Sequence, residues 1–450
     1  MEIKGKKILV IGLGKSGEGC ARFLNKRGAK VTITDNRTTD DLNEISETLR
    51  SEGINVELGE HRLESFYGSD LMVISPGVPH KLQPVKLAFE SGVPLIGEIE
   101  LAFQFIKEPI AAITGTNGKT TAVTILGEMF RESGKKVFVG GNIGTPLINY
   151  IDMDEKVDVV VLELSSFQLD TIKNFRANAS AIINITDDHL DRYDDFQAYA
   201  RSKGRIYENQ TSDDVSVVNL DDSGITKLSK VLKSRKYYIN GDENEFGAQI
   251  NEDSIKFNTI ETGVFEIKCK DINIFGKHNY ENIASAALIS ASMGATVDGI
   301  KKAVMNFKGL PHRIEFVKDI KGVKYFNDSK ATNTDAVIRA LESFTTPVIL
   351  ILGGRSKNSD FRILRDSIEK HAKKVIVLGE AKDEIKRAIG DLAETTGVET
   401  LEKAVVMSGR MAVPGDIVLF SPACASFDMF NSYIHRGEEF TKLVTGSLKR

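Results

Sequence analysis

The stretch that decides the fold is a short apolar run leading into a glycine-rich turn, Ile110-Ala111-Ala112-Ile113-Thr114-Gly115-Thr116-Asn117-Gly118-Lys119-Thr120-Thr121. Its first four residues predict a buried strand. The residues after it place Val123, Leu126 and Phe130 on one face of a helix. The stretch therefore predicts a strand, a tight turn and a helix, the unit from which α/β folds are built.

The turn Gly115–Thr121 has the composition of a phosphate-binding loop. Glycines let backbone N–H groups converge on a phosphate, and the N-terminus of the helix adds a favourable dipole. Lys119 supplies a positive charge, and the hydroxyl of Thr120 suits Mg²⁺. The spacing is shorter than in the common GxxxxGK[ST] pattern, and the alternative is a turn that only begins a helix. The strand before the turn and the helix after it favour the phosphate-binding interpretation.

Strands and helices alternate along the rest of the chain, which predicts an α/β fold with parallel sheets. We expect three domains, at residues 1–97, 98–308 and 309–450. Short β-like runs between about residues 215 and 274 predict a smaller β region in the second domain. The other predicted strands are Lys7–Ile11, Lys30–Thr34 and Leu71–Ile74 in the first domain, Val157–Leu162 and Ala181–Ile185 in the second, and Lys324–Phe326, Pro347–Leu352, Lys374–Leu378 and Asp416–Phe420 in the third.

Composition excludes several classes of protein. The net charge of −4 with interspersed signs gives no basic stripe, so we expect no nucleic-acid partner. The three cysteines show no paired spacing, which argues against a disulfide framework or a zinc site. No apolar run approaches the roughly 18 residues of a membrane span, and the N-terminus has no cleavage site for a signal peptide. We therefore expect a cytoplasmic protein.

A second glycine motif, Gly12-x-Gly14-x-x-Gly17, follows the first predicted strand, and Asp35 ends the next. This is the dinucleotide-binding fingerprint of Rossmann-type domains. A tight turn without a ligand is one alternative, and hydride transfer with a nicotinamide cofactor is another. Because the chain has a separate phosphate loop, we expect this turn to hold a nucleotide attached to the substrate.

Two candidate metal ligands follow buried strands of the second domain. Glu163 and His189 both fall at the carboxyl ends of strands, where open α/β sheets place ligands. Mg²⁺ prefers oxygen ligands, which Glu163 supplies, whereas histidine is a less usual ligand for this ion. The alternatives are a helix-capping carboxylate for Glu163 and a hydrogen-bonded polar residue for His189.

Taken together, a series of motifs resembles the Mur ligase family of cell-wall peptide synthetases over essentially the whole chain. Glu163–Leu169 and Ser421–Ser426 look most like the member that adds D-glutamate. The motifs are Gly115–Thr121, Gly141–Gly144, Glu163–Leu169, Asp188–Tyr193, Gly276–Asn282, Leu310–Arg313, Asn327–Asn333 and Ser421–Ser426.

The resemblance implies a Rossmann-like N-terminal domain for the UDP end of the substrate, a central P-loop ATPase domain and a Rossmann-like C-terminal domain for the amino acid. The residues that it places near the UDP-linked substrate are Gly14, Lys15, Ser16, Asp35, Asn36, Arg37, Ser75, Pro76, Gly77, Asn142 and His189. Those that it places around ATP are Gly115, Thr116, Asn117, Gly118, Lys119, Thr120, Thr121, Asn279, Asn282, Arg313 and Asp328.

The resemblance also implies two Mg²⁺ ions. Thr120 and Glu163 would bind metal, His189 would help with a second ion, and Lys203 would contribute as a carbamate. Lys119, His189 and Lys203 are thus the expected catalytic residues. A carbamate makes chemical sense, because a neutral amine that traps CO₂ gains an anionic oxygen for the metal. Without the family context, Lys203 would be interpreted as an exposed helical lysine.

For D-glutamate, the resemblance implies a pocket of cations, hydroxyls and aromatic rings, as a dicarboxylate requires. Arg355-Ser356 depart from the family pattern before Lys357, where an acidic residue or a glycine is usual, and Tyr433 stands where phenylalanine is expected. The residues are Lys330, Thr332, Lys357, Ser426, Phe427 and Tyr433.

The activity implied is ATP-dependent ligation of D-glutamate to UDP-N-acetylmuramoyl-L-alanine through an acyl phosphate, by a monomer. Alternatives of the same class are sibling ligases for L-alanine, a diamino acid or a dipeptide, and a folylpolyglutamate synthetase. Alternatives of other classes are an NAD-dependent oxidoreductase, which would use Gly12–Gly17, and a P-loop phosphotransferase or nucleotide-gated binding protein.

Overall fold

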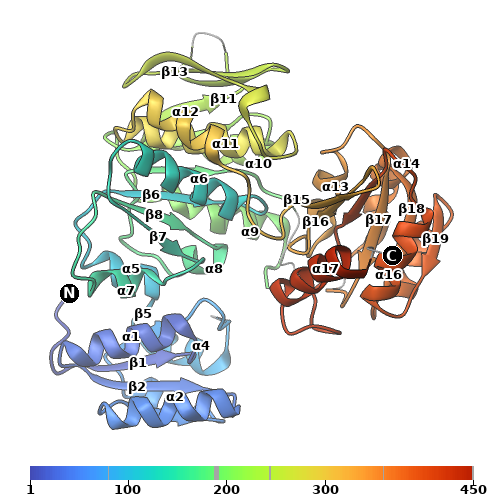
Figure 1. Cartoon of the computed structure of the whole chain (residues 1–450). Coiled ribbons are helices and arrows are strands. Elements are labelled where there is room, and N and C mark those ends of the chain that lie inside the picture. The colour runs from blue at the N-terminus through green and yellow to red at the C-terminus, as the bar shows by residue number, and fades with distance from the viewer. Residues whose placement is uncertain (80, 187–191, 243–244, 358, 448–450) are drawn as a thin grey trace. The chain divides into compact units, whose positions relative to one another are not determined.

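The computed structural model describes residues 1–79, 81–186, 192–242, 245–357 and 359–447 (Figure 1). The chain divides into two compact units. Unit 1 comprises Met1–Cys269 and Glu281–Val304, and unit 2 comprises Lys270–Tyr280 and Met305–Arg450. Two largely parallel sheets with helices lie in unit 1 and a third lies in unit 2, which confirms the predicted α/β class. The boundaries at 97/98 and 308/309 stay predictions.

The first sheet of unit 1 is parallel, with the strand order β3-β2-β1-β4-β5 (blue in Figure 1). The order changes direction at β1, and open α/β sheets bind ligands at such a point, outside the carboxyl ends of the strands. Its strands are β1 (Lys7–Ile11), β2 (Lys30–Asp35), β3 (Asn55–Leu58), β4 (Leu71–Ile74) and β5 (Leu95–Gly97), and its helices are α1 (Lys15–Lys26), α2 (Asp40–Ser51), α3 (Leu63–Tyr67) and α4 (Gln83–Glu90).

The second sheet of unit 1 has the order β14-β13-β12-β11-β10-β9-β6-β8-β7. The strands from β7 to β12 are parallel, and β13 and β14 add an antiparallel end. The expected smaller β region therefore continues the central sheet. The strands are β6 (Ile110–Thr114), β7 (Val137–Gly141), β8 (Val159–Glu163), β9 (Ala179–Ile182), β10 (Val215–Asn219), β11 (Arg235–Ile239), β12 (Gly247–Ile250), β13 (Ser254–Thr259) and β14 (Gly263–Lys268).

The central strands β6, β8 and β9 are fully buried, as their unbroken apolar sequences predict. β9 ends at Ile182, three residues before the predicted end at Ile185, because Asn184 turns its side chain to the phosphate loop. The helices of this part of the chain are α5 (Glu98–Phe103), α6 (Lys119–Glu132), α7 (Leu147–Ile151), α8 (Ser166–Leu169), α9 (Phe196–Gly204), η1 (Arg205–Tyr207), α10 (Ser223–Ser229), η2 (Cys269–Asp271), α11 (His278–Ser292) and α12 (Val297–Asn306).

Unit 2 holds a sheet of order β15-β16-β20-β17-β18-β19, parallel except for the β15–β16 hairpin. Buried clusters cover both of its faces. Its strands are β15 (Glu315–Ile320), β16 (Val323–Asn327), β17 (Val348–Gly353), β18 (Ala372–Leu378), β19 (Glu394–Gly397) and β20 (Ile417–Phe420), and its helices are α13 (Thr334–Leu341), η3 (Phe361–Leu364), α14 (Arg365–His371), α15 (Lys382–Ile389), α16 (Leu401–Met411) and α17 (Tyr433–Ser447).

Among the helices of the described residues, none combines the length and the apolar character needed to cross a membrane.

A buried carboxylate fixes the loop that precedes β9. Glu100, on α5, is 1% exposed. Its Oε2 accepts hydrogen bonds from the backbone N–H groups of Lys173 (2.8 Å), Asn174 (2.9 Å) and Phe175 (2.9 Å), and its Oε1 accepts from the N–H of Asn174 at 3.0 Å. Buried N–H groups that lose their acceptor are costly, so Glu100 holds this loop against the segment that joins the two sheets of unit 1.

We expect Glu100→Ala to lower the free energy of unfolding by about 3 kcal/mol, because three backbone N–H groups would lose a charged acceptor that is itself buried. Urea denaturation followed by circular dichroism measures the change. Glu90→Ala is the matched control, because Glu90 is exposed and its change should stay within about 0.5 kcal/mol. Equal effects of the two substitutions would contradict the role of Glu100 in fixing this loop.

Candidate active site

The predicted phosphate loop connects β6 to α6, as the sequence indicates. Gly118 has φ +83°, a left-handed conformation that favours glycine, and a Cβ there would lie 2.6 Å from Oδ1 of Asn282. The ammonium group of Lys119 donates to the carbonyl oxygens of Gly115 (2.9 Å) and Thr116 (2.8 Å), so its charge is held over the loop. The loop thus brings together a cation, a helix N-terminus and a close approach of the backbone to Asn282.

Asn184, which the sequence analysis did not select, braces this loop. Its Oδ1 accepts from the N–H groups of Thr116 (3.2 Å) and Asn117 (2.9 Å), and its Nδ2 donates to the carbonyl oxygen of Asn117 (2.9 Å). The available signal was one amide residue within the apolar run Ala181–Ile185. Such a residue in an otherwise apolar segment must find hydrogen-bond partners, because it lies where water does not reach.

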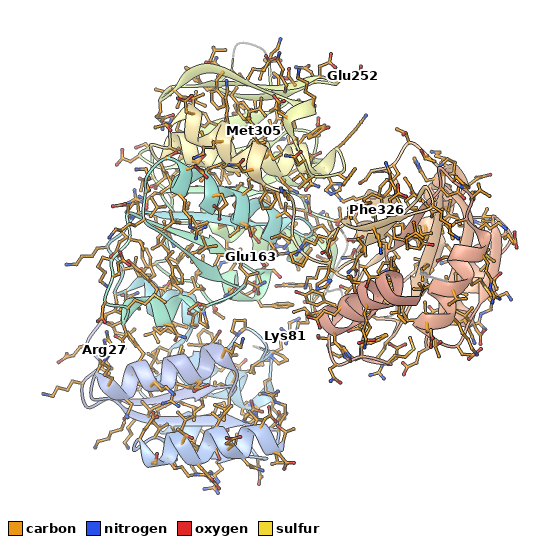
Figure 2. The ribbon with its side chains drawn as sticks, in the orientation of Figure 1. Arg27, Lys81, Glu163, Glu252, Met305 and Phe326 are labelled. Carbon is orange, nitrogen blue, oxygen red and sulfur yellow. The ribbon has the colours of Figure 1, made fainter. Side chains whose placement is uncertain are left out.

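Glu163 ends β8 beside the phosphate loop and is labelled in Figure 2. It pairs in register with Ile113, and it is 2% exposed. Oε1 accepts from Nδ2 of Asn142 at 2.8 Å, whereas Oε2 is buried and has no hydrogen-bond partner within the described residues. A buried carboxylate oxygen without a donor is costly unless a cation or another donor meets it. Glu163 therefore fits the predicted role of metal ligand.

The other expected metal ligands can be placed only in part. Thr120 lies in the first turn of α6 and is partly buried. His189 belongs to residues 187–191, outside the described part of the chain. No cluster of three or more His, Cys, Asp or Glu side chains arranged for a metal occurs among the described residues. Binding of Mg²⁺ by Thr120, Glu163 and His189 thus stays a prediction.

Lys203 is buried against the phosphate loop. It lies in α9 and is 2% exposed, which excludes the exposed helical lysine. Its Nζ donates to the carbonyl oxygen of Gly115 at 2.7 Å and lies 4.5 Å from the centroid of the Tyr199 ring. The Tyr199 hydroxyl lies 3.2 Å from Oγ1 of Thr116. α9 therefore holds the amine against the phosphate loop, and the catalytic role of Lys203 stays a prediction.

The residues predicted for the UDP-linked substrate surround one cavity of about 530 Å³ in unit 1. Every one of them that is described lines this cavity, and His189 again lies outside the described residues. Seven further residues line it. Gly12 belongs to the glycine motif that was expected to hold the nucleotide, Gly141 and Gln168 belong to motifs of the family resemblance, and the sequence analysis missed His61, Val78, Pro79 and Leu82. The predicted lining residues are Gly14, Lys15, Ser16, Asp35, Asn36, Arg37, Ser75, Pro76, Gly77 and Asn142.

Asp35 and Arg37 form a fixed charged pair in this cavity. Oδ2 of Asp35 accepts from the N–H of Leu13 (2.8 Å), and both carboxylate oxygens accept from the Arg37 guanidinium (2.9 and 2.8 Å). Burial raises the pKa of Asp35, but the hydrogen bonds from Arg37 and Leu13 outweigh it and lower this pKa to about 2. Asp35 is therefore ionised and orients Arg37 at the cavity.

The residues predicted to surround ATP divide between the two units. Residues 115–121 and Asn282 belong to unit 1, whereas Asn279, Arg313 and Asp328 belong to unit 2. In unit 2, Nδ2 of Asn279 donates to the carbonyl oxygen of Phe275 at 2.5 Å. A nucleotide contact from these residues stays a prediction.

The residues predicted for D-glutamate all lie in unit 2. Nζ of Lys330 lies 3.9 Å from the centroid of the Tyr433 ring, so the tyrosine that replaces the expected phenylalanine still meets this lysine through its ring face. Ser426 is buried, Phe427 is 65% exposed, and Thr332 and Lys357 lie at the surface in part or fully. Their joint contact with D-glutamate stays a prediction.

Arg436, on α17, is a site residue that the sequence analysis missed. It is 2% exposed, and its guanidinium donates to Oγ of Ser329 (2.9 Å) and to the carbonyl oxygens of Ser329 (2.7 Å) and Cys424 (3.0 Å). It thereby joins the loop that carries Lys330 to the loop that carries Ser426. Nothing in the local sequence His435-Arg436-Gly437 distinguishes this arginine from an exposed helical one.

Arg355, the departure from the family pattern, is held by two contacts. Its guanidinium makes two hydrogen bonds of 2.9 Å to the carboxylate of Glu380. Its backbone exchanges hydrogen bonds with Ala425 at 2.9 and 3.0 Å, which places the turn beside the loop of Ser426. The Arg355–Glu380 pair is half-exposed, so we assign it little stabilising energy.

Three family models match the chain. The Mur ligase MurD-like N-terminal domain matches residues 6–97, the Mur ligase middle domain matches residues 113–290, and the Mur ligase glutamate ligase domain matches residues 312–424.

Curated relatives match over nearly the full length. The UDP-N-acetylmuramoylalanine–D-glutamate ligase of Desulfosudis oleivorans is 48% identical over 445 residues, covering 99% of this chain and 97% of the relative. The protein of the same name from Desulfatibacillum aliphaticivorans is 46% identical, covering 99% of each chain.

Among solved structures, the MurF ligase of Thermotoga maritima in complex with ADP aligns with a TM-score of 0.62 at 18% identity, covering 100% of this chain and 96% of that one. The UDP-N-acetylmuramate–alanine ligase of the same organism aligns with a TM-score of 0.60 at 20% identity, covering 98% and 100%. At these identities, the likeness shows a shared fold.

The buried carboxyl group of Asp328 in unit 2 should make the stability of the protein depend on pH. Its Oδ2 accepts from Oγ of Ser421 (2.7 Å) and its Oδ1 from the N–H of Ile314 (3.2 Å). Burial raises the pKa of Asp328 to about 7, against the lowering effect of the Ser421 and Ile314 hydrogen bonds. Because the folded pKa exceeds the ordinary value of 3.8, the folded state binds the proton more tightly than the unfolded state does.

This contribution to stability is full below pH 3.8 and is lost as the pH rises through about 7. Asp328→Asn, which cannot ionise, should therefore gain up to about 4 kcal/mol relative to wild type between pH 4 and pH 8. Urea denaturation across this range measures the difference. Asp383→Asn, an exposed aspartate of the same unit, is the control. A difference that does not change with pH would contradict the prediction.

Proposed function

The chain belongs to the Mur ligase family, and we propose that it joins D-glutamate to UDP-N-acetylmuramoyl-L-alanine, converting ATP to ADP and phosphate. The observation that carries this proposal is near-full-length identity of 48% and 46% with ligases of that name. The geometry of unit 1 supports it independently, because a phosphate loop, a buried carboxylate and a buried lysine lie together beside a cavity lined by the predicted UDP residues.

In the first step, an oxygen of the L-alanyl carboxylate attacks the γ-phosphorus of ATP. The bond from that phosphorus to the β,γ-bridging oxygen breaks, which gives ADP and an acyl phosphate. Charge builds on the transferred phosphoryl group, so catalysis depends on positioned cations and N–H donors. Lys119, held over the loop by two carbonyl oxygens, supplies one such cation.

Mg²⁺ fits this site. Glu163 offers a buried oxygen without a hydrogen-bond donor among the described residues, and Thr120 lies in the phosphate loop, in the first turn of α6. When bound, Mg²⁺ would neutralise charge on the phosphate oxygens. We propose Glu163 and Thr120 as ligands, with His189 assisting a second ion. Asn142 holds the other oxygen of Glu163 and so fixes the direction in which the free one points.

In the second step, the amine of D-glutamate attacks the acyl carbonyl carbon and loses a proton, for which we propose His189 as the acceptor. The tetrahedral intermediate then expels phosphate and leaves an amide. We propose that Lys330, Thr332, Lys357, Ser426, Phe427 and Tyr433 receive the amino acid. Arg436 supports this role, because it ties together the two loops that carry Lys330 and Ser426. We also propose that the enzyme acts as a monomer in the cytoplasm, as the family resemblance implies.

The first test is phosphate release from ATP with Mg²⁺ and UDP-N-acetylmuramoyl-L-alanine, using D-glutamate, L-glutamate, L-alanine, L-lysine and diaminopimelate in turn. We expect release with D-glutamate alone, and none when the UDP-linked substrate is omitted. Release with another amino acid would move the enzyme to a sibling activity. Release without any amino acid would indicate a phosphotransferase or a nucleotide-gated protein instead.

A second test concerns Lys203, which we propose to be carbamylated. In the carbamate, the nitrogen of Lys203 bonds to the carbon of CO₂ and loses a proton. Lys203→Arg keeps a cation but cannot form this product, so we expect activity to fall at least about 100-fold. ¹³C NMR of the wild type in ¹³C-bicarbonate should show a carbamate signal that the variant lacks. Lys230→Arg, at an exposed site, is the control, and an active Lys203→Arg enzyme would contradict the proposal.

A further inference from the structure

One wall of the cavity is a tight turn between β4 and α4. The N–H of Val78 donates to the carbonyl oxygen of Ser75 at 3.0 Å, so Pro76 and Gly77 occupy the two central positions, of which the first favours proline. Oγ of Ser75 donates to the carbonyl oxygen of Gly12 at 2.9 Å, which ties the start of the turn to the first glycine motif. The turn is thus held at its base by its own sheet.

The tip of this turn is held by Arg192, which lies in the connection between β9 and α9. Its guanidinium donates to the carbonyl oxygen of Gly77 at 2.8 Å and lies 3.4 Å from that of Pro76. The Pro76 carbonyl belongs to the central peptide of the turn, and the Gly77 carbonyl belongs to its last peptide. Because the carbonyl and N–H of one peptide point in opposite directions, binding the Pro76 carbonyl directs the Gly77 N–H away from Arg192. That N–H donates to no group of the described residues, and Gly77 lines the cavity.

Arg192 is itself fixed by aromatic side chains. Its Cζ lies 4.3 Å from the centroid of the Phe167 ring, and Phe167 stacks on Tyr193 with centroids 6.0 Å apart and planes at 8°. The Tyr193 hydroxyl donates to Oδ2 of Asp170 at 2.7 Å. A guanidinium packed on a ring has little freedom to move, so it imposes a direction on the carbonyls that it binds.

We propose that Arg192 is a positioning residue for the UDP end of the substrate: it sets the turn Ser75–Val78 so that the Gly77 N–H faces the cavity as a donor. This inference rests on the proposed function, which supplies the UDP-linked substrate. Arg192 touches no reacting atom in this role. It stands three residues after His189 in the sequence, so one short segment carries both the predicted catalytic histidine and the brace of the substrate-binding turn.

The competing explanation is that Arg192 only attaches the first sheet to the central one. The chain offers a matched control, because Lys81, labelled in Figure 2, pairs with Asp194 at 2.7 Å between the same two segments. Their side chains are 58% and 82% exposed, and neither lines the cavity. If Arg192 only attached the two sheets, loss of Arg192 and loss of Lys81 should affect UDP binding equally. If Arg192 positions the turn, only its loss should weaken UDP binding.

The experiment measures UDP binding by calorimetry and steady-state kinetics for wild type, Arg192→Ala, Arg192→Lys and Lys81→Ala, each as the full chain. For Arg192→Ala, we expect the Kd of UDP and the KM of the UDP-linked substrate to rise about ten- to a hundred-fold, because charged hydrogen bonds are lost. The KM values of ATP and D-glutamate should not change. Arg192→Lys keeps the charge and one donor, so it should show a smaller rise, and Lys81→Ala should match wild type.

Each other result overturns the inference. Wild-type affinity for UDP in Arg192→Ala and Arg192→Lys would show that the turn does not need the arginine. Equal losses in Arg192→Ala and Lys81→Ala would assign both links to attachment of the sheets, as would a parallel rise in the KM of ATP. A wild-type protein that does not bind UDP would overturn the proposed function as well, which separates the two failures.

Discussion

The parallel pairing of β6 with β8 on one side and with β9 on the other is the constraint on which the candidate active site depends. Parallel strands end at the same edge of a sheet, so the loops that follow these three strands must meet. The phosphate loop follows β6, Glu163 ends β8, and Asn184 follows β9. The register of these strands thereby brings Lys119, Glu163 and Asn184 to the same edge of the sheet.

This constraint explains which parts of the site could be predicted from the sequence. Glycines at 115 and 118 and a lysine at 119 are recognisable because a phosphate cradle needs these residue types in adjacent positions. The cavity residues were predictable for the same reason, because they cluster in turns at strand ends. Lys203 could be selected only through the family resemblance. Its local sequence indicates an exposed helical lysine, and its burial depends on contact with Gly115, 88 residues earlier in the chain.

The residues that were missed act through long-range contacts. Arg436 binds Ser329, which is 107 residues earlier in the chain, and no pattern in the local sequence predicts such a distant partner. The continuation of the central sheet into β12, β13 and β14 was also missed, because short strands with polar residues look alike whether they form a separate layer or extend a sheet. The identity of elements thus follows from local sequence, whereas their neighbours follow from packing.

Charge in unit 2 gives a physical reason for a dicarboxylate as the second substrate. Burial lowers the pKa of Arg436 to about 10, which still leaves the guanidinium charged at neutral pH. Its hydrogen-bond partners among the described residues are a hydroxyl and carbonyl oxygens, and Asp428 and Asp328 act on it only through their charge. The carboxyl of Asp328, with a pKa of about 7, is only partly ionised there. Lys330 lies on the loop that Arg436 holds, so an anionic ligand at these loops would meet two cationic side chains, with Asp328 and Asp428 as neighbouring carboxyl groups.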